Sequence, residues 1–266
     1  MTSLQRRLAE AEPWSVVPER DLLYLLLTGG EVMMIACDSD GGIGPKASDT
    51  VACPGLELGR FAARVPLLEV VAAGGTPVAL VDTLSVEREP TGAAILEGVY
   101  IEARSAGLPD DAVTGSTEDN VTTVATGVGV TVIGRATMDS LCAGKARRGD
   151  LVVLLGRPMS APVDHVTPEH SEVLDVPALV RAMGLEMTHE ALPIGSGGVS
   201  HELRQLAASA GLGAEAFPDW PVDQDQSGGP STSALLVVDG MHDPDTVLAT
   251  VRAATGLPAW VIARLI

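Results

Sequence analysis

The sequence predicts an α/β protein of two domains. Its 266 residues are 46% hydrophobic but only 3% aromatic, so its core consists mainly of Ala, Val and Leu. Such a core suits helices packed on sheets better than an aromatic-rich β-sandwich. Short apolar runs alternate with longer segments of helical periodicity, and a basic, glycine-punctuated stretch at residues 143–150 divides them into two sets. A chain of this length can bury a sizeable core. We therefore expect one domain at residues 1–143 and a second at 144–266.

The elements expected in the first domain follow from apolar spacing and from stop signals. A short polar helix or arm over residues 4–12 comes first, and the dense leucine run at 21–27 predicts a buried helical turn. Apolar residues recur at helical spacing over 56–73, where Gly74 and Gly75 end the helix. The other elements expected here are strands at 31–37, 77–85 and 127–134, a helix at 91–106 and a polar turn at 115–120.

The second domain is expected to begin with the continuous apolar run 151–155, which is typical of a strand buried on both faces. A proline-marked loop at 156–169 follows. The glycine-rich segment 192–198 leads into a helix, and residues 218–230 read as a loop rich in Pro, Asp, Gln and Gly. The regular elements expected here are helices near 172–183, 200–210 and 245–255 and strands at 233–238 and 259–266.

Charge and cysteine content exclude several classes of protein. The formal net charge of −18 argues against nucleic-acid binding, which needs a basic face. No apolar stretch approaches the roughly 20 residues needed to span a bilayer, and no secretory signal opens the chain. We expect a cytoplasmic protein with neither membrane nor nucleic-acid partners. Cys37, Cys53 and Cys142 show no C-x-x-C spacing and are expected to be buried free thiols.

One segment carries the clearest chemical signal, Met34-Ile-Ala-Cys-Asp38-Ser-Asp40-Gly-Gly-Ile-Gly44-Pro-Lys46. A predicted strand ends here on two carboxylates, which are hard oxygen ligands suited to Mg²⁺. The glycines allow backbone N–H groups to approach an oxyanion, and Lys46 adds a cation. This combination suits a phosphate or a nucleotide. It is not a Walker P-loop, because no G-x-x-x-x-G-K-[ST] occurs. A plain glycine-rich turn is the alternative reading.

The order of such segments resembles the aminoimidazole ribonucleotide (AIR) synthase-related superfamily, which also contains thiamine-monophosphate kinase, selenophosphate synthetase and the hydrogenase maturation dehydratase. The segment Asp38 to Lys46 is similar to the Asp-Gly-[Val/Ile]-Gly-Thr-Lys loop of the synthetase. Glu69-Val-Val-Ala-Ala-Gly-Gly75-Thr-Pro77 resembles the family's Ala-x-Gly-Ala-x-Pro helix end. Three further segments match in the same order: 115–135, Arg147-Arg-Gly-Asp150 and Ser227-Gly-Gly-Pro-Ser231. The resemblance therefore covers nearly the whole chain.

The resemblance implies a homodimer in which the N-terminal domains of two subunits pair their strands into a barrel. ATP would lie in a cleft beside this barrel with Mg²⁺ on its phosphates. The implied reaction is phosphoryl transfer to a small molecule, or activation of an oxygen by ATP. The implied metal ligands are Asp38, Asp40, Asp82, Glu118 and Asp119; the catalytic residues are Lys46 and Asp40; the nucleotide-binding positions are Gly41, Gly42, Gly44, Lys46, Gly115, Ser116, Thr117, Gly195, Gly197 and Gly198.

Departures from the family pattern leave three functions open. Many members carry an Asn-Asp or Ser-Asp pair in the helix after the first loop, but Ala62-Ala-Arg64-Val-Pro66 lacks it, and Asp82 is the residue expected to compensate. Residues 114–134 look most like the α-ribazole kinase branch, which acts in cobalamin salvage. A small-molecule kinase is the leading interpretation. The alternatives are a synthetase or ligase acting on a ribonucleotide, and a non-catalytic nucleotide-binding dimer.

Overall fold

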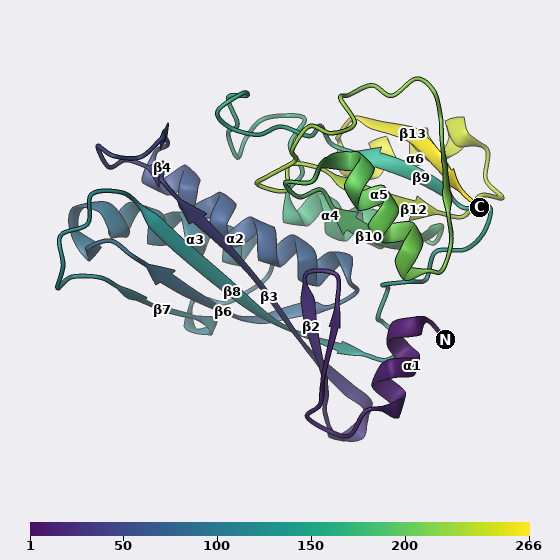
Figure 1. Cartoon of the computed structure of the whole chain (residues 1–266), viewed down its shortest axis with the longest axis horizontal. Helices are drawn as coiled ribbons and strands as arrows, with labels where there is room; N and C mark the ends of the chain where they lie inside the picture. Colours follow the sequence, from purple (N-terminus) through teal and green to yellow (C-terminus); the bar gives the residue numbers. More distant parts are fainter.

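Two sheets, each packed against helices, organise the chain (Figure 1). The computed structural model describes all residues, 1–266. The first sheet has six strands in the order β1-β2-β3-β8-β6-β7, and every neighbouring pair is antiparallel except β6–β7. Its strands are β1 (Val16–Glu19), β2 (Leu22–Leu26), β3 (Glu31–Gly41), β6 (Thr76–Leu84), β7 (Val113–Thr117) and β8 (Gly127–Thr137). The helices around it are α1 (Ser3–Glu10), α2 (Gly55–Ala72) and α3 (Ala93–Ser105), and a small parallel pair is formed by β4 (Ile43–Gly44) and β5 (Val51–Ala52).

The second sheet has five antiparallel strands in the order β10-β12-β9-β13-β11. They are β9 (Leu151–Leu155), β10 (Thr188–Pro193), β11 (Ala214–Ala216), β12 (Ala234–Val238) and β13 (Ala259–Leu265). Its helices are α4 (Val176–Met183), α5 (Gly198–Ser209) and α6 (Pro244–Thr255). Every residue of β9 and β12 is buried because α4 and α6 pack on one face while α5 packs on the other. This confirms the prediction that residues 151–155 form a doubly buried strand.

The two central strands of the first sheet explain how the site is oriented. β3 and β8 are each 11 residues long and pair along their whole length. Val32, Met34 and Ala36 are buried against the helices, whereas Cys37 is exposed on the opposite face. Because side chains alternate across a strand, Asp38 continues the buried row and faces the helical layer.

Helices α2 and α3 cover this buried face side by side (Figure 1). Two glycines allow their backbones to approach. A Cβ on Gly59 of α2 would lie 1.9 Å from the carbonyl oxygen of Ile95, and a Cβ on Gly98 of α3 would lie 2.1 Å from that of Leu56. Any larger residue at either position would therefore push the two helices apart.

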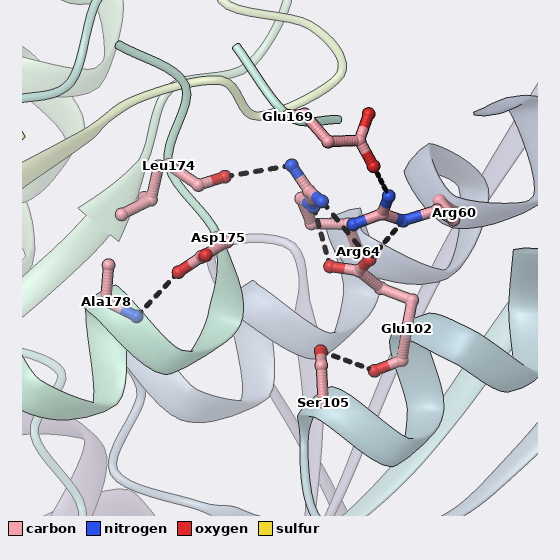
Figure 2. Close-up of polar contacts among 8 residues, drawn as sticks. All are labelled: Arg60, Arg64, Glu102, Ser105, Glu169, Leu174, Asp175 and Ala178. Atoms are coloured by element: carbon pink, nitrogen blue, oxygen red, sulfur yellow. Dashed lines mark hydrogen bonds and ion pairs between the residues drawn. The ribbon is translucent and has the colours of Figure 1, made fainter. Parts of the chain in front are cut away.

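A buried ion-pair network joins α2 and α3 to the second domain (Figure 2). Arg64 of α2 is fully buried and donates to both carboxylate oxygens of Glu102 in α3, at 2.7 and 3.1 Å. Its remaining nitrogen donates to the carbonyl of Leu174 at 3.3 Å. Arg60, one turn earlier, also pairs with Glu102 and reaches Glu169. Both Leu174 and Glu169 lie ahead of α4, so this network joins the two domains.

Most predicted elements are confirmed, but several expectations are wrong. Residues 21–27 form strand β2 rather than a helical turn, since Leu22 and Tyr24 are buried and Leu23 between them is exposed. The polar turn expected at 115–120 is a strand as far as Thr117. Strand β10 was not predicted, and α5 begins at Gly198, inside the expected loop. The three cysteines are free, as expected, but none is buried.

The α/β class and the two-domain arrangement are confirmed. The boundary at 143/144 and the barrel formed across a dimer stay predictions. None of the helices combines the length and the apolar character needed to cross a membrane.

Candidate functional site

The C-terminal ends of β3, β6 and β7 lie at the same end of the first sheet, because these three strands run in the same direction. β3 and β6 are both antiparallel to β8, and β7 is parallel to β6. Asp38 and Asp82 are each paired with Val130 of β8, and Gly115 is paired with Asp82. A Cβ on Gly115 would lie 2.2 Å from Oδ1 of Asp82, so only glycine leaves room for this carboxylate. The structure therefore brings these three predicted site residues into one row.

Two carboxylates at this end of the sheet each have a buried oxygen without a hydrogen-bond partner. They are Oδ2 of Asp40 and Oδ1 of Asp82. Burial raises the pKa of both groups to about 6, and for Asp40 the nearby charge of Asp38 adds to the effect. A buried carboxylate oxygen that accepts no hydrogen bond is costly unless a cation or a proton compensates. These two atoms therefore fit a role as metal ligands.

A second set of carboxylates gathers where the two domains meet. Asp21 lies in the β1–β2 turn, Asp38 on β3, Glu69 on α2 and Glu202 on α5. Burial, together with the charges of Asp21, Glu202 and Asp38, raises the pKa of Glu69 to about 8, although the charge of Arg20 opposes the rise. The pKa values of Asp38 and Glu202 are also raised, chiefly by burial, and the charge of Asp21 adds to the rise. We call these four acids the interdomain carboxylate cluster.

The cluster is not a preformed metal cage, since no three of its side chains are arranged to hold an ion by themselves. Mg²⁺ does not require such a cage. It is commonly held by one or two carboxylates while waters and substrate phosphates complete its octahedron. Burial is the main cause of the raised pKa of Glu69, and repulsion among the cluster's acids adds to it; a divalent cation would relieve that repulsion. The residues present therefore fit a magnesium–phosphate group.

Glu69 is a candidate site residue that the sequence interpretation did not select. The family's metal-binding pair in the helix corresponds to Ala62–Pro66 of α2, where no carboxylate occurs. The structure instead brings Glu69 of the same helix near Asp38. The signal in the sequence was a lone carboxylate within the apolar run Leu67–Val71, whose other four residues are all buried.

The side chain of Lys46 already bonds to other groups of the protein. Its ammonium group donates to Oε2 of Glu87 at 2.7 Å and to the carbonyl of Thr123 at 3.1 Å. The hydrogen bond from Lys46 lowers the pKa of Glu87 to about 2. Asp49 fixes the loop by accepting from the backbone N–H groups of Lys46 and Thr126. A phosphate would have to compete with Glu87 for the Lys46 charge.

The glycines of the loop between Asp40 and Lys46 make contacts that stabilise the loop itself. Gly42, with φ of 72°, donates to the carbonyl of Thr126 and accepts from Thr50. Gly44, with φ of 151°, has no room for a Cβ, which would lie 2.5 Å from the Thr126 hydroxyl. Gly41 ends β3. These contacts close the loop on itself, and phosphate binding by its backbone stays a prediction.

Glu118 and Asp119 accept hydrogen bonds from residues in or next to their own turn. Glu118 accepts from the N–H groups of Asn120 and Val121 at 2.8 and 3.2 Å. Asp119 accepts from the Thr117 hydroxyl at 2.6 Å and from the N–H of Arg88 at 3.0 Å, and these bonds lower its pKa. Their hydrogen bonds do not link them to Asp38, Asp40 or Asp82. Ser116 lies beside Thr83 in the β6–β7 ladder, and its role stays a prediction.

The glycine segment 195–198 adjoins the interdomain carboxylate cluster. A Cβ on Gly195 would lie 3.3 Å from Oε1 of Glu202. Gly198 has φ of 78°, and the backbone of Asp225 leaves no space for a side chain there. The N–H groups of Gly198 and Ser200 donate to backbone carbonyls, so these two amides at the start of α5 are already used. A Cβ on Gly197 would meet only the side chain of His201.

We expect the metal-free protein to lose stability as the pH rises from about 5 to about 8. Glu69 keeps its proton up to a pKa of about 8 when folded but releases it near 4.5 when unfolded. Between these values the folded state binds more protons, so stability falls with rising pH. Asp40 and Asp82 add to the fall below pH 6. Thermal unfolding in EDTA across this range measures the effect. Glu69→Gln should flatten the curve between pH 6 and 8, and an unchanged curve would contradict the assignment.

The two-domain arrangement of sheets and helices is an AIR-synthase-like fold, which the chain shares with solved structures. No protein-family model matches the sequence, and neither does any curated protein. The resemblance to solved structures is therefore the finding that places the fold.

Three solved structures illustrate it. The tt0281 protein of Thermus thermophilus matches with a TM-score of 0.65 at 20% identity, over 99% of this chain and 92% of that one. The hydrogenase maturation protein HypE of E. coli matches with a TM-score of 0.63 at 16% identity, over 87% and 79%. Thiamine-monophosphate kinase of Stenotrophomonas maltophilia matches with a TM-score of 0.62 at 16% identity, over 98% and 91%. Identities this low show a shared fold.

Proposed function

We propose that the chain binds ATP together with Mg²⁺ and transfers a phosphoryl group to a small molecule. The observation that carries the proposal is the interdomain carboxylate cluster, in which burial and mutual repulsion leave Glu69 with a pKa of about 8. Support comes from proteins of the same fold. One is a thiamine-monophosphate kinase, HypE has been solved in complex with ATP, and PurL of T. maritima with AMPPCP.

In this proposal Asp38 and Glu69 hold Mg²⁺, with Asp40 and Asp82 at the adjoining strand ends. The bound ion would neutralise charge that develops on the transferring phosphoryl group. Asp40, whose pKa is about 6, is suited to accept the proton of an acceptor hydroxyl near neutral pH. Lys46 would contribute its charge after leaving Glu87.

The acceptor we propose is a nucleoside hydroxyl of the α-ribazole type, which would place the reaction in cobalamin salvage. This rests on the resemblance of residues 114–134 to the α-ribazole kinase branch. The test offers ATP and Mg²⁺ with α-ribazole, thiamine phosphate or formylglycinamidine ribonucleotide and identifies products by mass spectrometry. A phosphorylated nucleoside is expected. A ribonucleotide altered at its amide with release of phosphate would show a ligase instead.

A non-catalytic nucleotide-binding dimer is the second candidate. It is favoured by the ion pair that holds Lys46 on Glu87 at 2.7 Å and by the helix α5 amides that are already bonded within the chain. If this candidate is right, calorimetry detects ATP binding, but ATP is neither hydrolysed nor used to phosphorylate any acceptor.

We predict a homodimer formed through the outer face of the first sheet. Leu23, Ile35, Ile133 and Ala79 form a continuous apolar row across β2, β3, β8 and β6 on the face opposite α2. Leu23 is 43% exposed and the others are partly exposed. Sedimentation at micromolar concentration should give a dimer, and Ile35→Lys should give a monomer because it buries an unpaired charge. A wild-type monomer would refute the prediction. Val163→Lys, on an exposed loop of the second domain, is the control.

A further inference from the structure

A cavity of about 620 Å³ lies between α1, the β1–β2 turn and the C-terminal end of α5. In Figure 1, α1 lies just below the lower end of α5. The walls of the cavity come from both domains, because α1 and the turn belong to the first and α5 to the second. None of its lining residues belongs to the interdomain carboxylate cluster. A ligand in this cavity would therefore use other residues than those proposed to hold Mg²⁺ and ATP.

The charge of this cavity is opposite to that of the chain. Its lining contains three arginines, Arg6, Arg7 and Arg20, and one carboxylate, Glu19. The side chains thus contribute a formal charge of +2 in a protein whose net charge is −18. Arg7 pairs with Glu19, whereas Arg6 is exposed and makes no ion pair. At least one cation is therefore free to meet a ligand.

Arg20 supplies a buried donor at the inner wall. Its side chain is only 7% exposed and pairs with Glu190 at 2.6 Å. The same terminal nitrogen donates to the hydroxyl of Ser209, another lining residue, at 2.5 Å. The Nε of Arg20 is buried and has no hydrogen-bond partner. Glu190 is shared, since it also accepts from the N–H of Ala146 at 2.9 Å. An unpartnered guanidinium N–H in a cavity wall is a position for an acceptor on a ligand.

We propose that this cavity binds a phosphorylated small molecule, with the phosphate between Arg6 and Arg20. Arginine presents N–H groups in a planar fork that matches phosphate oxygens, and such charge-assisted bonds are the strong ones. The volume lies in the usual range for small-molecule sites. Thr2, Ser3 and Gln205 offer hydroxyl and amide groups for the hydroxyls of a sugar. The ligand class is therefore a sugar phosphate or nucleoside monophosphate, and it would bridge the two domains.

The test is calorimetric titration in EDTA, so that no metal-dependent nucleotide site contributes. Ribose 5-phosphate is the probe, ribose is its uncharged counterpart, and inorganic phosphate is the arm that separates recognition of the phosphate from recognition of the sugar. We expect ribose 5-phosphate to bind and ribose not to bind. Arg6→Gln should weaken binding about tenfold or more, the loss expected when a charge-assisted hydrogen bond is removed. Arg20→Lys keeps the ion pair with Glu190 but removes Nε, and it should weaken binding similarly.

Two control variants make the outcome decisive. Arg148→Gln removes an exposed arginine outside the cavity and should leave affinity unchanged. Asp38→Asn, in the carboxylate cluster, should also leave it unchanged, although it abolishes the site proposed for Mg²⁺ and ATP. Absence of binding by both ribose 5-phosphate and inorganic phosphate would overturn the proposal. So would an equal loss in Arg148→Gln, which would show general charge attraction, or a loss in Asp38→Asn, which would show binding at the nucleotide site.

Discussion

The double variant Asp38→Asn/Glu69→Gln is expected to lose metal-dependent ATP binding, with affinity in Mg²⁺ falling on the order of a hundredfold. The two changes remove the two charged carboxylates that we propose as Mg²⁺ ligands, one on β3 and one on α2, while keeping the shape of each side chain. Calorimetric titration of ATP with Mg²⁺ and with EDTA measures the effect. The wild type should show a large difference between the two conditions, and the variant should show almost none.

The same variant should be more stable than the wild type at pH 8, which separates a binding role from a structural one. Burial and neighbouring acids raise the pKa of Glu69 to about 8, so its ionised form is unfavourable in the folded protein. Replacing it with a neutral amide removes that penalty. Loss of ATP binding together with a higher melting temperature is the expected pair of results. Undiminished ATP affinity would refute the site.

Glu118→Gln/Asp119→Asn is the matched comparison, because it also neutralises two acids suggested as metal ligands. In the structure these two carboxylates cap their own turn and bond to Asn120, Val121, Thr117 and Arg88. We expect this pair to retain most of the metal-dependent affinity. If it loses as much as Asp38→Asn/Glu69→Gln, the metal site lies at the end of β7 instead.

Long elements were predictable because their apolar spacing recurs over several turns or alternations. The helix at 56–73 and the strand at 127–134 are of this kind. The prediction of a helical turn at 21–27 was wrong because the six adjacent apolar residues 22–27 show no period. The strand is revealed only by its pairing with β3, which buries Leu22 and Tyr24. Strand β10 was overlooked because its Glu190 is polar; in the structure that side chain is buried, where it pairs with Arg20 and accepts from the N–H of Ala146.

The site was predictable only where its residues are adjacent in the sequence. Asp38 and Asp40 stand out because two acids end an apolar strand. Asp21 and Glu69 come from separate elements that the folding of the first domain brings together, and the packing of the second domain against the first adds Glu202. The partner of Lys46 was equally hidden, since Glu87 lies on a different loop. A resemblance to a family indicates which residue types to expect, whereas the packing decides which side chains face one another.

Arg64→Met is expected to destabilise the fold by about 3–5 kcal/mol, the usual cost of breaking a buried ion pair by removing one partner. Arg64 is 0% exposed and Glu102 only 1% exposed, so water cannot replace the lost donors. The methionine fills much of the space beside Phe61, over whose ring the guanidinium lies at 5.0 Å. For a chain of this size the loss corresponds to a fall in melting temperature of roughly 10 °C. Differential scanning calorimetry measures it.

Arg104→Met is the matched control for this prediction. Arg104 pairs with Asp110 at 2.6 Å, but both side chains are more than half exposed, so its loss should leave the melting temperature nearly unchanged. Arg64→Met/Glu102→Leu removes both buried charges and should recover part of the stability lost in Arg64→Met, since no unpaired carboxylate remains. Arg60, which lies 3.3 Å from Glu102, then keeps its contact with Glu169. Similar melting temperatures for Arg64→Met and Arg104→Met would show that the network in Figure 2 is not what joins the two domains.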